Sequence, residues 1–286
     1  MNRILSFIAA VLLAASSASA QSWARTRLDN SPRHQEWVTV KDGARSVQCF
    51  VVYPEVKDKA TVVLVIHEIY GLSDWARSLA DELAEAGYIA VAPDLVSGLA
   101  PGGGGTSEFP AQSAVTKAVS MLPAAQVTAD LNAVADYAVQ IPAANGKLVV
   151  AGFCWGGGKS FQFAADRHDL KEAFVFYGTA PAPEDLARIA CPVYGFYAEN
   201  DGRIGATIPK TVDLMKQAGK AYEPVTYSGA GHGFMRAGDA PESALPAPPA
   251  DPAAVAKYQH DLAAYRANKK ARDDAWARLV ALLPKA

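Results

Sequence analysis

A cysteine lies at the centre of the sequence Gly152-Phe153-Cys154-Trp155-Gly156, and its surroundings suit a nucleophile. Residues 147–151 are mostly apolar and predict a short buried strand, whereas residues 157–167 can continue as a helix. A strand, a tight turn and a helix form the context in which a G-x-nucleophile-x-G pattern presents its central side chain above a sheet. The helix N-terminus beneath that side chain favours negative charge, which would favour a thiolate. The alternative is a buried structural cysteine in a glycine-rich turn.

Two further residues able to do chemistry follow apolar runs later in the chain. Asp201 comes after residues 193–197, and His232, between two glycines, comes after residues 222–227. Open α/β sheets place their ligands beyond the carboxyl ends of the strands, so these side chains are expected at one edge. Nucleophile, acid and histidine appear in the chain order of an α/β-hydrolase triad. An Asp before a Gly is otherwise a common turn residue, and the histidines at 34, 168 and 260 are expected at the surface.

The segments that must position these residues alternate between strand and helix patterns. Asp42-Gly43 separates two β-prone runs, residues 36–40 and 45–53, and predicts an N-terminal β-hairpin. Residues 61–66 form a continuous apolar run, typical of a strand buried on both faces of a parallel sheet. Further strands are expected at 88–92, 148–151, 173–177, 193–197 and 222–227. Helices are expected between Ser73 and Gly87, at 126–140, 157–167 and 210–218, and at 253–283 with a break near Asn268.

This alternation, without an internal repeat, predicts one α/β domain at residues 36–286, with a mostly parallel, doubly wound sheet flanked by helices. The N-terminus differs in character. Residues 1–20 combine a basic start, an apolar run and the small residues Ala18-Ser19-Ala20, the pattern of a signal peptide. We therefore expect an exported protein, periplasmic or secreted, with no membrane span after cleavage. Residues 21–35 form a polar N-terminal segment, and residues 21–32 of it are expected to be loosely ordered.

Composition excludes some classes of function. Half of the 286 residues are apolar, a fifth are charged, and the net charge of −2 offers no basic surface for nucleic acid. Of the three cysteines, Cys49 and Cys191 could form a disulfide, a question that the sequence leaves open. Neither the cysteines nor the histidines have metal-ligand spacing, so no metal and no cofactor is expected. The four glycines within residues 99–106 predict a mobile surface loop rather than a nucleotide-binding loop, since no Gly-Lys-Ser/Thr follows.

From about Glu36 to Leu283 the chain resembles the dienelactone hydrolase family of the α/β-hydrolases. The matching stretches are residues 67–71 (His-Glu-Ile-Tyr-Gly), 152–157, 199–201 and 231–234. The resemblance implies that Cys154 is the nucleophile, His232 the base and Asp201 the residue that orients it. The backbone N–H groups of Ile69 and Trp155 are the expected donors to the tetrahedral oxyanion.

The same resemblance implies roles for Glu68 and Arg236, whereas the other substrate-binding residues of the family cannot be placed in this chain. Glu68 would contact the nucleophilic thiol and shift when substrate binds, helping to release the thiolate; without that context it would be a surface or loop-capping group. Arg236 matches a position that binds a substrate carboxylate, although a solvent-facing arginine is the alternative. Tyr70 and Phe234 are candidates to line the pocket, as is Trp155, and each could equally serve packing.

Taken together, the residues and the resemblance predict a cofactor-free hydrolase that uses a Cys-His-Asp triad and a thioester acyl-enzyme. Its expected substrate is an ester or lactone that bears a carboxylate, as a dienelactone does. Its partner would be a small-molecule substrate, and the protein would be a monomer or a small homo-oligomer. Two alternatives remain on the same scaffold. One is a carboxylesterase or thioesterase of broader range, and the other is a non-catalytic binding protein. A redox-active Cys154 is also conceivable, but no resolving cysteine lies nearby in sequence.

Overall fold

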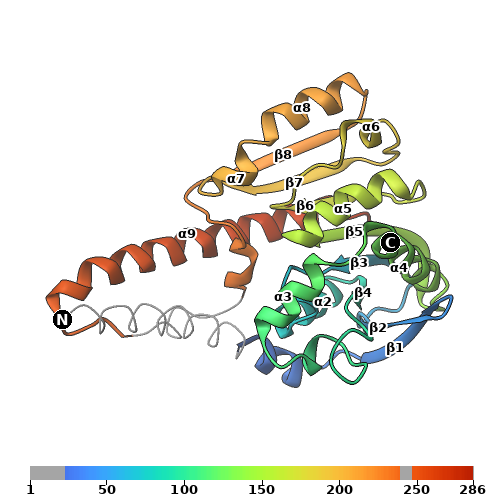
Figure 1. The fold of residues 1–286 in the computed structure, drawn as a ribbon, viewed down its shortest axis with the longest axis horizontal. Coiled ribbons are helices and arrows are strands. Elements are labelled where there is room, and N and C mark those ends of the chain that lie inside the picture. The colour runs from blue at the N-terminus through green and yellow to red at the C-terminus, as the bar shows by residue number, and fades with distance from the viewer. Residues whose placement is uncertain (1–22, 239–246, 286) are drawn as a thin grey trace.

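The structure is a computed structural model that describes residues 23–238 and 247–285. Its centre is an eight-stranded sheet in the order β1-β2-β4-β3-β5-β6-β7-β8 (Figure 1). Strand β2 pairs in antiparallel fashion with β1 on one side and β4 on the other, and the remaining neighbours are parallel. The strands are β1 (Gln35–Asp42), β2 (Arg45–Val52), β3 (Ala60–Ile66), β4 (Ile89–Asp94), β5 (Ala144–Phe153), β6 (Ala173–Phe176), β7 (Val193–Ala198) and β8 (Tyr222–Tyr227). The predicted fold class and hairpin are confirmed.

Helices follow most strands and cover both faces of the sheet (Figure 1). They are α2 (Asp74–Glu85), α3 (Gln112–Ser120), α4 (Ala124–Val139), α5 (Trp155–Asp166), α6 (Pro183–Leu186), α7 (Gly202–Gly205), α8 (Ile208–Gln217) and α9 (Pro252–Leu282), with 3-10 turns η1 (Thr106–Glu108) and η2 (Phe234–Ala237). Among the described residues no helix is both long and apolar enough to cross a bilayer.

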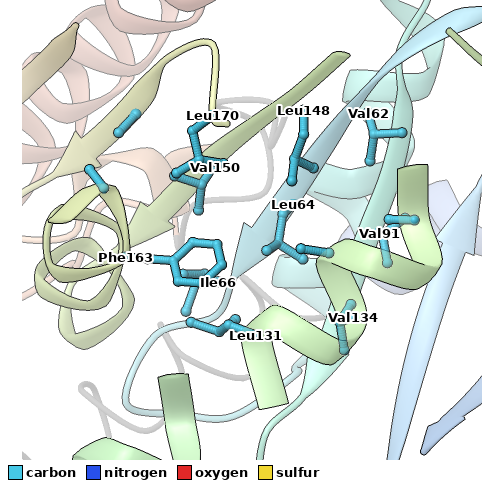
Figure 2. Packing of buried hydrophobic residues seen from close by; sticks show 14 of the residues in the cluster. Val62, Leu64, Ile66, Val91, Leu131, Val134, Leu148, Val150, Phe163 and Leu170 are labelled. Atoms are coloured by element: carbon cyan, nitrogen blue, oxygen red, sulfur yellow. The ribbon is translucent and has the colours of Figure 1, made fainter. Parts of the chain in front are cut away.

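Alternate residues of β3 build the two apolar layers. Val62, Leu64 and Ile66 face the helices α4 and α5, and Figure 2 shows them beside side chains such as Leu131 and Phe163. The intervening residues of β3, Val63 and Val65, belong to the opposite layer, which α2 and the end of α9 cover. Every residue of β3 is buried, as expected for a strand packed on both faces.

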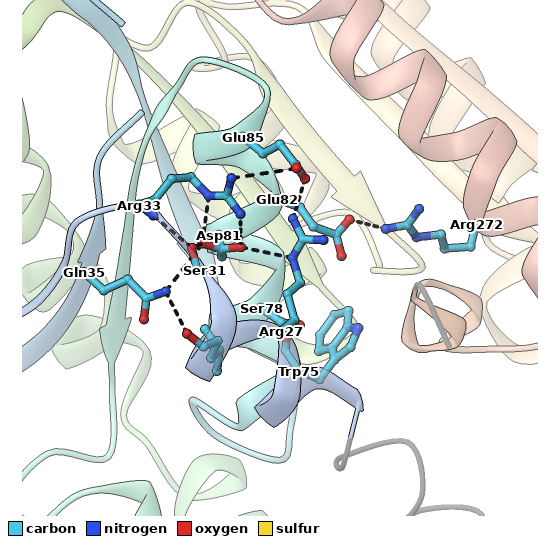
Figure 3. A network of polar contacts seen from close by, with 11 residues as sticks. Arg27, Ser31, Arg33, Gln35, Trp75, Ser78, Asp81, Glu82, Glu85 and Arg272 are labelled. Carbon is cyan, nitrogen blue, oxygen red and sulfur yellow. Dashed lines mark hydrogen bonds and ion pairs between the residues drawn. The ribbon is translucent and has the colours of Figure 1, made fainter. Parts of the chain in front are cut away.

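The ends of α2 bear out its predicted signals. The side chain of Ser73 accepts a hydrogen bond from the backbone N–H of Ala76, and Gly87 follows the helix with a φ of +98°. Asp81 of this helix has a buried carboxylate, which accepts hydrogen bonds from Arg33 and Ser31 (Figure 3).

Two expectations are wrong, and the helix α3 was missed. The segment expected to be loosely ordered is helical at residues 23–30, because Ala24 and Leu28 are buried and Arg27 donates to Asp81 at 3.0 Å. The helix α9 continues through Asn268 without a break. The short helix α3 was not expected at all, because only Val115 and Val119 of its nine residues are buried and its apolar pattern is correspondingly weak.

The glycine-rich segment, residues 99–106, is anchored to the sheet at its end and is more than a linker. The carboxylate of Asp94, the last residue of β4, accepts hydrogen bonds from the Thr106 backbone N–H at 2.7 Å and from the Thr106 hydroxyl at 2.8 Å. The predicted signal peptide, residues 1–20, lies outside the described residues, as does the first half (241–246) of the proline-rich stretch 241–252.

Candidate active site

Cys154 occupies the sharp turn between β5 and α5 and has a φ of +56°, which is unusual for a residue with a side chain. Its backbone N–H donates to the carbonyl of Phe176 at 3.0 Å. The turn requires the two flanking glycines. A Cβ on Gly152 would lie 2.0 Å from the Gly156 carbonyl oxygen, and a Cβ on Gly156 would lie 2.4 Å from the His67 carbonyl oxygen. The predicted strand–turn–helix context is therefore present.

The side chains of Cys154, His232 and Asp201 form one chain of contacts. The Nε2 of His232 lies 3.1 Å from the Cys154 Sγ, and its Nδ1 is hydrogen-bonded to the carboxylate of Asp201. Asp201 is nearly buried after β7, and its other oxygen accepts from the Ile204 N–H at 3.3 Å. His232 retains 28% of its side-chain exposure. The structure thus brings together the three residues expected to form a triad.

Electrostatics around His232 favour its protonated form. The contact with Cys154 raises the pKa of His232, burial opposes this effect, and Asp201 raises the pKa further. The net result is a pKa above the ordinary histidine value. The loop that carries His232 is held from α9, because the Asn268 side-chain oxygen accepts from the Gly231 N–H at 2.7 Å.

Glu68 is buried and contacts two residues, Tyr177 and Arg236. Its carboxylate accepts from the Tyr177 hydroxyl at 3.1 Å, and Oε2 lies 3.4 Å from the Arg236 Nε. Burial raises the pKa of Glu68, while Arg236, Tyr177 and His232 act in the opposite direction. Within the described part of the chain Glu68 makes no hydrogen bond to Cys154, and the contact implied by the family resemblance stays a prediction.

Arg236 and Tyr70 lie together. The guanidinium of Arg236 is 5.3 Å from the centre of the Tyr70 ring, and it packs against Gly233, where a Cβ would come within 2.1 Å of Nη2. Phe234, by contrast, is only 1% exposed and packs in the core against Tyr177 and Tyr227. The structure therefore places Phe234 away from any surface that a substrate reaches, because its ring completes the apolar layer under the loop.

A cavity of about 740 Å³ opens beside the cysteine. Ile69 and Trp155, the expected oxyanion donors, line it together with Cys154 and Tyr177. A larger hollow of about 830 Å³ lies between the glycine-rich segment and the strands β1 and β2, and none of the three contacting residues lines it. The larger cavity is therefore not the candidate active site, which is identified by the position of the Cys154 thiol rather than by volume.

Three residues of the site were missed in the sequence. Tyr177 has a φ of +40°, donates to Glu68 and packs edge-on against the His232 ring with centroids 5.0 Å apart. Its position between β6 and Gly178 was the available signal. Asn268 has no local sequence signal because it acts from α9, which is distant in the chain. Lys159 has none because the sequence does not show which face of its helix points toward the cavity.

The other two cysteines are free and buried. Cys49 lies in β2 and Cys191 next to β7, and four strands separate these two in the sheet. With neighbouring strands about 4.8 Å apart, the pair is far beyond disulfide reach. Burial raises the pKa of Cys191 to about 11 and also raises that of Cys49, so both thiols are unreactive relative to an accessible one. Within the described residues no three potential ligands gather to hold a metal ion.

The strand order, the turn at Cys154 and the residues beyond β7 and β8 define an α/β-hydrolase. The sequence profile of the Dienelactone hydrolase family matches residues 47–286, and the chain belongs to this family. A Methylorubrum extorquens protein named "Putative carboxymethylenebutenolidase" is 30% identical over 234 residues, covering 78% of this chain and 79% of that protein. A Salmonella typhi protein of the same name is 33% identical over 198 residues, covering 63% of this chain and 70% of that protein.

The fold has close counterparts among solved structures. The Klebsiella pneumoniae structure named "Putative Dienelactone Hydrolase" is 26% identical, covers 82% of this chain and 98% of its own, and superposes with a TM-score of 0.65. The family assignment made from the four sequence stretches is confirmed.

Proposed function

We propose that this protein hydrolyses an ester or lactone, with Cys154 as nucleophile. The observation that carries the proposal is the 3.1 Å contact between the Cys154 Sγ and the His232 Nε2, with the His232 Nδ1 held by Asp201. Membership of the dienelactone hydrolase family and the names of the relatives support the same reaction class.

The chemistry follows from the order of these groups. His232 accepts the thiol proton, and the Cys154 thiolate attacks the acyl carbon. The N–H groups of Ile69 and Trp155 would stabilise the oxyanion. Collapse breaks the C–O bond, the leaving oxygen takes the proton from His232, and a thioester remains on Cys154. Water then attacks the thioester with His232 as base and regenerates the thiol. For a lactone the alcohol stays on the same molecule, so the product is one hydroxy acid.

Glu68 and Arg236 are proposed to influence the deprotonation of the Cys154 thiol without reacting with the substrate carbonyl. Their ion pair is buried on the Glu68 side, and Arg236 opposes the rise that burial causes in the pKa of Glu68. A Glu68 carboxylate that loses this arginine partner would be more basic and would help to take up the thiol proton. We propose that a substrate that engages Arg236 changes the position of Glu68. Tyr70, stacked on Arg236, would follow that change.

The deciding experiment measures hydrolysis of a dienelactone and of a p-nitrophenyl ester by the protein and by Cys154→Ala. We expect activity that disappears in the variant, and the ratio of the two substrates separates a lactonase from a broad carboxylesterase or thioesterase. Absence of both activities in folded protein with a free thiol would favour the non-catalytic binding protein. Export remains a proposal from residues 1–20, tested by fractionation and N-terminal sequencing of the mature protein.

A further inference from the structure

His67 is buried beside the candidate active site, and the mechanism proposed above gives it no role. It follows β3 and precedes Glu68 and Ile69, and its side chain is fully inaccessible to solvent. A buried imidazole has two ring nitrogens that both need hydrogen-bond partners. The partners of these two nitrogens therefore indicate what the ring does.

One of these partners determines which nitrogen carries the proton. The backbone N–H of Leu95, the residue after β4, donates to the His67 Nε2 at 3.3 Å, so Nε2 is an acceptor. The proton of the neutral ring then lies on Nδ1, which donates to the Glu68 carbonyl oxygen at 2.7 Å. Burial lowers the pKa of His67 and favours the neutral ring, although the carboxylate of Asp94 opposes this effect.

The Glu68 carbonyl belongs to the same peptide group as the Ile69 N–H, one of the two expected oxyanion donors. Because a peptide group is planar, hydrogen bonds to its oxygen restrict the direction of its N–H. The Glu68 oxygen accepts two, from the His67 Nδ1 and from the Gly71 N–H at 3.1 Å. These bonds also polarise the peptide group and strengthen its N–H as a donor. Among residues 23–238 and 247–285 the Ile69 N–H donates to no other group, and Ile69 lines the cavity beside Cys154.

His67 also contacts Trp155, the residue that carries the second expected donor. The two rings are stacked, with centroids 5.6 Å apart and planes inclined by 14°. The backbone of Gly156 packs closely on the same segment, since a Cβ there would lie 2.4 Å from the carbonyl oxygens of both Ile66 and His67. One imidazole therefore contacts both sides of the expected oxyanion hole.

We propose that His67 is a positioning residue for the oxyanion hole, because its Nδ1–H fixes the Glu68 carbonyl and thereby orients the Ile69 N–H toward the oxygen of the tetrahedral intermediate. The inference rests on the proposed hydrolysis at Cys154 and adds a second histidine to it. Unlike His232, His67 transfers no proton in the reaction. Its removal misaligns a donor that acts on the transition state and leaves binding of the substrate in its ground state intact.

The test measures the acylation burst of p-nitrophenyl acetate in two variants of His67. His67→Leu removes the donor to Glu68. We expect the burst rate to fall about 10- to 100-fold, since loss of a whole oxyanion donor costs roughly 10²- to 10³-fold. The ester concentration that gives half of the maximal burst rate should change less than about twofold. His67→Asn places an amide N–H near the position of Nδ1 and should recover most of the rate.

A matched control removes a histidine–carbonyl contact elsewhere. The His168 Nε2 lies 3.2 Å from the carbonyl oxygen of Ala165, and neither residue lines the cavity beside Cys154. His168→Leu should therefore leave the burst unchanged. A burst as fast in His67→Leu as in the wild-type protein would overturn the proposal. Equal losses in His67→Leu and His67→Asn would also overturn it, because they would assign the effect to packing on Trp155.

A trifluoromethyl ketone gives a readout that needs no turnover, because its adduct with the Cys154 thiol carries an oxyanion like that of the tetrahedral intermediate. Its dissociation constant should rise about tenfold or more in His67→Leu and stay near the wild-type value in His67→Asn. If this difference appears but no ester is hydrolysed, the proposed function fails while the role of His67 holds. Equal affinities, or no adduct at all, would overturn that role.

The position of the ring proton can be measured in the wild-type protein, independently of whether the variants fold. Nitrogen-15 NMR of the histidine rings should show His67 neutral and protonated at Nδ1 between about pH 5 and 8. A proton on Nε2 would leave the Glu68 carbonyl without this donor and would overturn the proposal.

Discussion

At the scale of single residues, the contacts of His232 with Cys154 and with Asp201 determine how the site responds to pH. Asp201 is one of the groups that raise the pKa of His232, so imidazolium persists to a higher pH than for a free histidine. A base that must accept the thiol proton loses activity as it becomes protonated. The acid limb of kcat/KM should therefore lie above the ordinary histidine pKa of about 6.5.

Asp201→Asn removes that charge and the correct orientation of the ring. We expect kcat to fall by roughly 10²- to 10⁴-fold and the acid limb to move to lower pH, because the pKa of His232 is no longer raised by a carboxylate. The measurement is a pH profile of kcat/KM on a p-nitrophenyl ester. An acid limb that stays in place would show that Asp201 does not set the pKa of this histidine.

Glu68 can be separated from the triad by its effect on acylation. Glu68→Gln keeps the size of the buried side chain and its contact with Tyr177, but removes the negative charge that pairs with Arg236. We expect the acylation burst of p-nitrophenol to slow by roughly 10²-fold while the melting temperature changes little. A burst of unchanged rate would contradict a role for Glu68 in the thiol step.

At the scale of elements, α9 contributes to the site from a distance. Asn268, midway along this helix, holds the His232 loop through the Gly231 N–H. Asn268→Leu should lower kcat roughly tenfold, since small displacements of a catalytic group are costly. Asn268→Asp keeps the acceptor oxygen and should recover most of the activity, and Lys270→Ala on the same helix serves as the neutral control. Equal kcat in Asn268→Leu and the wild-type protein would mean that the loop holds His232 unaided.

The elements also show which features a sequence can reveal. Cys154, Asp201 and His232 were predictable because each follows a strand whose apolar pattern is local and strong. A break was expected at Asn268 because asparagine has a poor helix propensity. The expectation was wrong because the hydrogen bond to Gly231 and the buried end of α9 outweigh that propensity. Tyr177 and Lys159 could not be placed, since their roles depend on which strands and helices come together in space.

At the scale of the whole molecule, two adjacent buried carboxylates of α2 tie three segments together. Asp81 on α2 binds Arg27 and Arg33 of the N-terminal segment, and its neighbour Glu82 pairs with Arg272 of α9 (Figure 3). Burial alone would raise the pKa of Asp81, but Arg33, Ser31 and Arg27 outweigh burial and lower it below its ordinary value.

Asp81→Asn should destabilise the protein by about 3 kcal/mol at neutral pH, because two arginines lose a buried partner. A depressed folded-state pKa gives stability that is present above the unfolded pKa and disappears as the pH falls through the folded value. Urea unfolding should therefore show a constant difference from the wild-type protein between about pH 5 and 8 that narrows below about pH 4. A difference independent of pH would assign the effect to packing rather than charge.

The three contacting residues of the site come from strand ends far apart in the chain. Cys154 and His232 are separated by 78 residues, Asp201 and His232 by 31, and β6 lies between the strand of the cysteine and that of the aspartate. Parallel pairings over such separations form late, after the loops between them have closed. Recovered hydrolysis during refolding would thus report completion of the sheet from β5 to β8, later than helix content measured by circular dichroism.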